Sequence, residues 1–152
     1  TLRHRYSKYE NFKNAYFVNK FPTTISERFD LVAALEVIEH LDDEKLNSMI
    51  SEIKTLLKKN GYVFITTPNN ENLDANKIYC PECGCVFHRW QHMRSWNTNS
   101  LKNFMEQNGF ITVAVMENNW CHTIVHKGKS ILKKILGNVE MPANLSYLGK
   151  KK

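Results

Sequence analysis

The chain has 152 residues, of which 42% are hydrophobic and 24% are charged, and this is the size and composition of one globular domain. Its formal net charge of +6 could favour nucleic acid or other anionic partners. Few aromatic residues are interleaved with the basic ones, as a base-stacking surface requires, so nucleic-acid binding is not favoured. No apolar run approaches the roughly 18 residues of a membrane span. No secretory signal is visible either, so we expect a cytoplasmic protein without a membrane partner.

The first part of the chain predicts two strands and a helix. Apolar runs predict strands over residues 15–19 and 31–35. The second run is apolar at every position, as expected of a strand buried on both faces of a parallel sheet. Apolar residues then recur at helical spacing over residues 46–57, which predicts an amphipathic helix.

Both ends of this helix carry sequence signals. Asp42 or Asp43 can cap its start, because a carboxylate there accepts hydrogen bonds from the free N–H groups of the first turn. Lys58 and Lys59 are expected in its last turn, where the helix dipole favours cations. Gly61 can supply the left-handed residue that ends it.

The second part of the chain continues the alternation of strands and helices. Strands are predicted over residues 62–67, 110–116 and 143–148, and helices over residues 97–108 and 130–136. Such an order predicts an α/β fold with a mostly parallel sheet covered by helices on both faces. Ligands bind these sheets beyond the carboxyl ends of the strands.

Three segments carry a family resemblance. FDLVAALEVIEHL, LLKKNGYVFITTPN and FMEQNGF, in this order, resemble the class I S-adenosylmethionine-dependent methyltransferases, and most of all the branch related to the ubiquinone-pathway O-methyltransferases. The resemblance implies a doubly wound, mostly parallel Rossmann-like sheet with an antiparallel last strand. The chain has no G-x-G, so the family's glycine-rich cofactor loop has no counterpart. We therefore expect residues 1–152 to form a partial methyltransferase domain without its first two strands. We also expect a Cys/His insertion at about 70–96 and a helical insertion at about 120–142.

The resemblance also implies a function and a set of site residues. The full-length protein would be an enzyme that transfers a methyl group from S-adenosylmethionine to a small-molecule acceptor. Ala34, Leu35 and Glu36 would lie beside the methionine part of the cofactor, and Asn19 near its adenine. His40, just beyond a strand end, is the candidate general base. The alternative class is a zinc-stapled basic module that binds RNA or a protein partner without catalysis.

The turn EVIEHL allows a second interpretation. Glu36, Glu39 and His40 share one face if a helical turn begins there, and two carboxylates with an imidazole suit a divalent cation. The turn is similar to one in the small-RNA ribose 2′-O-methyltransferases, in which a later histidine completes a metal site. That histidine would be His92 in this chain. In the other interpretation these side chains line the active-site cleft without a metal.

The segment CPECGCVFHRWQH concentrates three of the four cysteines. In a reducing compartment such clusters indicate metal ligands or redox groups. Cys80, Cys83, His88 and His92 can supply the two thiolates and two imidazoles of a structural zinc site, and Cys85 could replace one histidine. A disulfide between Cys80 and Cys83 and a metal-free loop are the alternatives.

Overall fold

The computed structural model describes residues 28–119 and 143–152. The strand predicted at 15–19, the helix predicted at 130–136, the helical insertion predicted at about 120–142 and Asn19 lie outside the described residues. Within them, no helix is long and apolar enough to cross a membrane.

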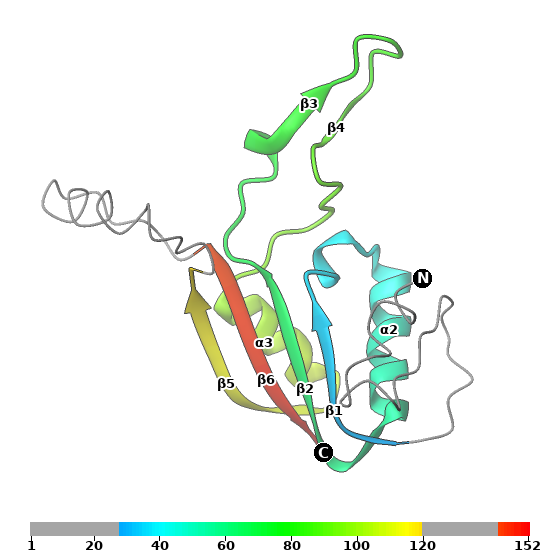
Figure 1. Ribbon diagram of the computed structural model, residues 1–152, viewed down its shortest axis with the longest axis vertical. Helices are drawn as coiled ribbons and strands as arrows, with labels where there is room; N and C mark the ends of the chain where they lie inside the picture. Colours follow the sequence, from blue (N-terminus) through cyan, green and yellow to red (C-terminus); the bar gives the residue numbers. More distant parts are fainter. Residues whose placement is uncertain (1–27, 120–142) are drawn as a thin grey trace, which may run out of the picture.

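A four-stranded sheet forms the centre of the described part, in the order β1-β2-β6-β5 (Figure 1). The strands are β1 (Phe29–Leu35), β2 (Leu57–Pro68), β5 (Phe110–Asn118) and β6 (Asn144–Lys151). β1 pairs with β2 in parallel, whereas β6 is antiparallel to both β2 and β5. Three strands therefore run in one direction and the last strand opposes them, which confirms the predicted sheet.

Two helices pack on one face of this sheet. They are α2 (Asp43–Leu56) and α3 (Thr98–Gln107). One hydrophobic core joins them to the strands, and Val63, Ile65 and Tyr147 contribute fully buried side chains from β2 and β6. On the opposite face Leu31 and Leu35 are 54% and 56% exposed. The apolar sequence of β1 predicted burial on both faces. Within the described residues, β1 is covered on one face only.

The predicted start of α2 is correct and its predicted end is wrong. Asp42 is the N-cap, and its side chain accepts a hydrogen bond of 2.8 Å from the Lys45 backbone N–H. The helix ends at Leu56, because the next residue, Leu57, is buried in the core and already pairs with β1. Lys58 and Lys59, expected in the helix, are therefore strand residues.

The left-handed residue at this turn is Asn60, with φ 64°, and not Gly61. Gly61 is needed for a different reason. A Cβ there would lie 3.0 Å from the Lys58 carbonyl oxygen and 3.1 Å from that of Phe29, which is tighter than ordinary contact. The end of α3 follows the prediction, since Gly109 has φ 85°.

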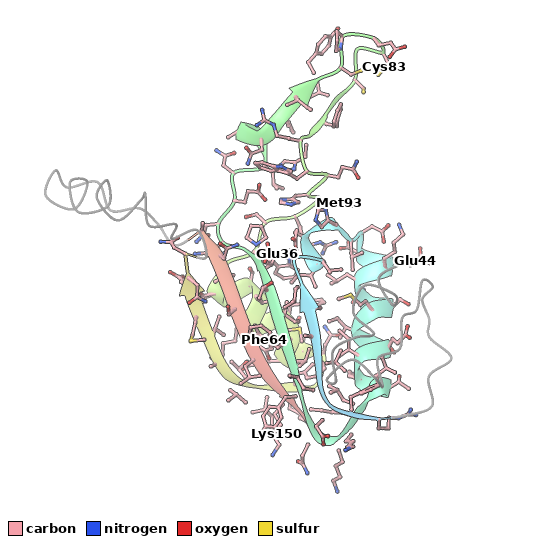
Figure 2. All side chains as sticks on the ribbon, in the orientation of Figure 1. Glu36, Glu44, Phe64, Cys83, Met93 and Lys150 are labelled. Carbon is pink, nitrogen blue, oxygen red and sulfur yellow. The ribbon has the colours of Figure 1, made fainter. Side chains whose placement is uncertain are left out.

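A long excursion, residues 69–97, separates β2 from α3. It holds a two-stranded antiparallel hairpin of β3 (Lys77–Tyr79) and β4 (Val86–His88), which extends beyond the carboxyl end of β2 (Figure 1). Cys83 lies at the far tip of this hairpin, whereas Glu36 and Met93 lie at the edge of the main sheet (Figure 2). The excursion thus has a base beside the sheet and a tip far from it.

Candidate functional site

The carboxyl end of β1 is held in an uncommon backbone conformation. Glu36 follows the strand directly and has φ 53°, in the left-handed region that non-glycine residues seldom adopt. Its backbone N–H points to Thr66 at the end of β2, 3.0 Å from the carbonyl oxygen and 3.2 Å from the hydroxyl oxygen. Such conformations persist where the surroundings fix them, and they concentrate at functional sites. Of the residues predicted to contact the cofactor, Ala34 is buried, and Leu35 and Glu36 are exposed at this edge.

A short 3₁₀ helix, η2 (Ile38–His40), follows and presents a carboxylate and an imidazole. Ile38 anchors it in the core. The Glu39 side chain is only 1% exposed, and its Oε2 accepts a hydrogen bond of 3.0 Å from the Thr67 hydroxyl. Burial raises the pKa of Glu39 above its usual value, and the hydrogen bonds offset part of that rise. His40 is 39% exposed, and its Nε2 lies 3.7 Å from Glu39 Oε1.

The last part of the excursion packs against η2 and places His92 beside His40. The Met93 N–H donates to the Glu39 carbonyl oxygen at 2.8 Å, and the Arg94 guanidinium donates to the Leu41 carbonyl oxygen at 2.6 and 3.0 Å. These contacts fix His92 against His40, with ring centroids 4.7 Å apart and planes at 77°. Residues more than 50 positions apart in the sequence thereby share one site.

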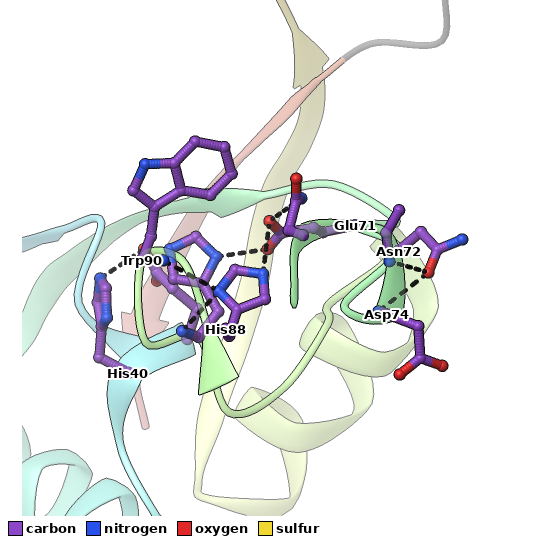
Figure 3. Close-up of polar contacts among 10 residues, drawn as sticks. His40, Glu71, Asn72, Asp74, His88 and Trp90 are labelled. Atoms are coloured by element: carbon purple, nitrogen blue, oxygen red, sulfur yellow. Dashed lines mark hydrogen bonds and ion pairs between the residues drawn. The ribbon is translucent and has the colours of Figure 1, made fainter. Parts of the chain in front are cut away.

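A glutamate that sequence analysis did not single out joins the two histidines of the excursion (Figure 3). Glu71 Oε2 lies 2.5 Å from His92 Nδ1, and Glu71 Oε1 lies 3.4 Å from His88 Nε2. All three side chains are about nine-tenths buried or more. The sequence signal for Glu71 was its position in the polar loop that directly follows the β2 strand end, where ligand-binding residues concentrate.

The predicted zinc ligands fall into two separate groups. Cys80 and Cys83 lie with Cys85 at the hairpin tip, where one sulfur from each lies within 4.8 Å of the others. His88 and His92 lie at the hairpin base with Glu71, so the structure does not bring the two predicted imidazoles to the two predicted thiols. The cause is the pairing of β3 with β4, which fixes His88 opposite Lys77 at the end of the ladder away from the tip.

A tight turn organises the three thiols. The Gly84 N–H donates to the Cys80 carbonyl oxygen at 2.9 Å, and Gly84 takes φ 72° to close the turn. The Cys80 N–H donates to the Cys85 carbonyl oxygen at 2.9 Å. Cys83 Sγ lies 3.0 Å from Cys85 Sγ, and this hydrogen bond lowers the pKa of Cys83 to about 7 and raises that of Cys85.

The fold and the site together define an α/β domain that carries its polar side chains at the carboxyl ends of neighbouring parallel strands. A family model described as a methyltransferase domain matches residues 3–115. The chain belongs to this family of class I methyltransferase domains.

Individual relatives agree with the family. An O-methyltransferase of ubiquinone biosynthesis from Glaesserella parasuis is 38% identical over 53 residues, which are 35% of this chain and 22% of that protein. A methyltransferase structure from Archaeoglobus fulgidus is 18% identical with a TM-score of 0.54, and one from Mesorhizobium loti is 16% identical with a TM-score of 0.53. The alignments cover 82% and 81% of this chain but only 60% and 62% of those chains. These structures support the fold, and this chain spans less than two thirds of each relative.

Proposed function

We propose that the intact protein carrying this chain transfers a methyl group from S-adenosylmethionine to a small-molecule acceptor. The observation that supports this most is the group of Glu39, His40 and His92 at the carboxyl edge of the sheet in a methyltransferase domain. The alternative class, a basic module that binds RNA or protein without catalysis, is not favoured by the family match.

In the proposed step, an acceptor lone pair attacks the methyl carbon of the sulfonium. The carbon–sulfur bond breaks and its electron pair stays on sulfur, which leaves neutral S-adenosylhomocysteine. The acceptor gives up one proton, so charge is conserved. Orientation of the two reactants supplies much of the rate. We propose that His40, half-exposed beside the buried Glu39, is the residue that activates the acceptor, in the role of general base that the sequence predicts.

We place the cofactor at the end of β1. Ala34, Leu35 and the strained Glu36 would contact its methionine part, and Asn19 its adenine. A related structure from Burkholderia thailandensis, 16% identical with a TM-score of 0.50, is an N1-methyltransferase with bound S-adenosylhomocysteine. It supports a cofactor site of this type in this fold.

The test is methyl transfer from radiolabelled S-adenosylmethionine, catalysed by the intact protein and measured over a panel of small hydroxyl- and amine-bearing acceptors. We expect label in at least one small molecule, and none when the acceptor is omitted. Label that appears only in added RNA or protein would contradict a small-molecule acceptor. No transfer to any acceptor, together with no binding of the cofactor, would contradict the enzyme.

We further propose that the hairpin tip binds structural zinc, with a ligand set different from the predicted one. Cys80, Cys83 and Cys85 supply the three sulfurs, and the low pKa of Cys83 favours the thiolate that zinc requires. Sulfur ligands about 2.3 Å from one zinc ion lie roughly 3.8 Å from each other. The three sulfurs here lie within 4.8 Å of one another, and the 3.0 Å between Cys83 and Cys85 would have to widen to hold the ion. The predicted cytoplasmic location would keep these thiols reduced.

The zinc content of purified variants distinguishes the three-thiol ligand set from the predicted set of two thiols and two imidazoles. Purified chain should carry one zinc ion, and Cys85→Ser should lower that content as strongly as Cys83→Ser, whereas His88→Ala should retain it. Retention in Cys85→Ser with loss in His88→Ala would favour the predicted thiolate–imidazole set instead. A wild-type chain without zinc, but with all its thiols free under reducing conditions, would contradict both sets.

A further inference from the structure

We infer that Glu71 positions the proposed base. It fixes the ring of His92, and His92 in turn holds the ring of His40 at the edge of the sheet. The inference rests on the proposed function for the role of His40, which remains the general base. Glu71 acts through two other side chains, so it is a positioning residue and not a catalytic one.

His40 needs a neighbour that holds its ring in place. The side chain is 39% exposed, and its Nε2 lies 3.7 Å from Glu39 Oε1, which is too far for a hydrogen bond. An exposed base without a hydrogen bond samples several rotamers. A displacement of about 1 Å between reacting groups can cost on the order of 10²-fold in rate, so the orientation of this ring matters for turnover.

The ring of His92 supplies this restraint. Its centroid lies 4.7 Å from that of His40, and the two planes meet at 77°. Aromatic rings prefer such edge-to-face arrangements. The His92 side chain is only 10% exposed, so the surrounding protein leaves it little room to move. It therefore presents a fixed surface to the more exposed ring of His40.

Glu71 determines how the His92 ring is oriented (Figure 3). Its Oε2 lies 2.5 Å from His92 Nδ1. An ionised carboxylate has no proton to donate, so the ring proton lies on Nδ1 and is donated to Glu71. A carboxylate in this position selects one tautomer and one orientation of an imidazole, as the aspartate of a Ser-His-Asp triad does. Rotation of the His92 ring by half a turn would place a carbon atom against the carboxylate instead.

Glu71 is itself held through its other oxygen. Its Oε1 accepts a hydrogen bond of 3.0 Å from the side-chain amide of Asn76, and His88 Nε2 lies 3.4 Å from the same oxygen. His88 Nδ1 accepts from the His92 backbone N–H at 3.1 Å, so the proton of neutral His88 is on Nε2, toward Glu71. Both carboxylate oxygens thus accept hydrogen bonds, from Asn76 and His92, and Glu71 cannot turn away without losing them.

These contacts could also serve only to hold the excursion together, and that alternative predicts a different result. Loss of a purely structural Glu71 would lower the melting temperature, but the folded protein would turn over at the wild-type rate. Loss of a positioning residue lowers the kcat of the folded protein with little change in KM, because the acceptor still binds but meets a misdirected base.

The test compares kcat, KM and melting temperature of the intact protein with those of its variants. We expect Glu71→Gln to lower kcat at least roughly tenfold, the effect typical of a carboxylate behind a functional histidine, while KM changes little. Glu71→Asp, which keeps the charge, should recover part of the loss. Glu44→Gln, exposed on α2, is the matched control and should behave as wild type does. Wild-type turnover in Glu71→Gln would overturn the inference and leave the proposed function.

A second pair of variants tests whether Glu71 acts through His92. In a His92→Ala background, Glu71→Gln should change kcat no further, because residues that act as a unit are not additive. A full additional loss of kcat in that background would show that Glu71 acts by another route, and it would overturn the inference.

A readout without turnover separates this inference from the proposed function. Nuclear magnetic resonance of isotopically labelled histidine rings should show the proton of His92 on Nδ1, and this signal should disappear in Glu71→Ala. A proton on Nε2 of His92 instead would overturn the inference, whatever the activity. The expected signal in a protein without any methyl transfer would overturn the proposed function, and with it the role of Glu71 in turnover, but would leave the pairing of Glu71 with His92.

Discussion

Glu71 gives two histidines four residues apart different environments. It accepts from His92 on one oxygen and faces His88 with the other. His88 accepts two backbone hydrogen bonds on Nδ1, and its Nε2 lies 3.4 Å from Glu71 Oε1 without a hydrogen bond. The ring of His92 lies against that of His40. One buried carboxylate thus lies beside both imidazoles, and His92 is the one that contacts His40.

Gly149 allows the buried ring of Tyr147 to lie along β6. A Cβ at Gly149 would lie 2.6 Å from the Tyr147 ring, and that ring is fully buried and cannot move aside. We expect Gly149→Ala to lower the free energy of unfolding by about 1–3 kcal/mol, the usual cost of overpacking. Chemical denaturation measures it. In a Tyr147→Leu background the cost of Gly149→Ala should fall, and an equal cost in both backgrounds would assign it to the backbone instead.

At the scale of elements, η2 lies between β1 and α2 and depends on the excursion. Backbone and guanidinium hydrogen bonds from Met93 and Arg94 reach Glu39 and Leu41, and Arg94 also pairs with Asp43 at the start of α2. Hydrogen bonds from the excursion thus hold both η2, which carries His40, and the start of α2.

The N-cap of α2 should contribute measurably to stability. Asp42 accepts from the Lys45 N–H, and its carboxylate also pairs with the Lys45 side chain. We expect Asp42→Ala to lower the free energy of unfolding and the melting temperature, whereas Asp42→Asn, which keeps an acceptor, should lower them less. Thermal and urea denaturation compare the two variants. An alanine variant as stable as the asparagine variant would show that the cap contributes nothing here.

The elements with local signals were predictable, and those set by distant contacts were not. Asp42, Gly109 and the strand runs followed from propensity and capping chemistry. The end of α2 did not, because the burial of Leu57 and its pairing with β1 override the helical pattern. The turn of Glu39 and His40 was found from its place after a strand, but Glu71 owes its role to contacts 17 and 21 residues away that no spacing reveals. The pairing of β3 with β4, which is also a tertiary feature, separates the thiols at the hairpin tip from the imidazoles at its base, although they are neighbours in sequence.

For the whole molecule, both described helices cover the same face of the sheet. Leu31, Leu35 and Tyr62 remain exposed on the other face. The described part thus contains the proposed acceptor edge and one covered face of a methyltransferase sheet.

The chain by itself should bind S-adenosylmethionine weakly. Its sequence has no G-x-G, the loop type on which the family binds the cofactor, whereas the edge at Glu36 offers only part of a site. Isothermal titration calorimetry of the purified chain should detect no tight binding. An affinity in the micromolar range would contradict this expectation and show that the remaining residues suffice.

The most direct test of the central claim is the turnover of His40→Ala in the intact protein, measured as radiolabelled methyl transfer under saturating cofactor and acceptor. If the edge formed by Glu39, His40 and His92 activates the acceptor, turnover should fall roughly 100-fold or more, since acid–base and electrostatic groups contribute on that order. The melting temperature and cofactor affinity should change little, because His40 is partly exposed. A His40→Ala protein that folds and turns over at the wild-type rate would contradict the account.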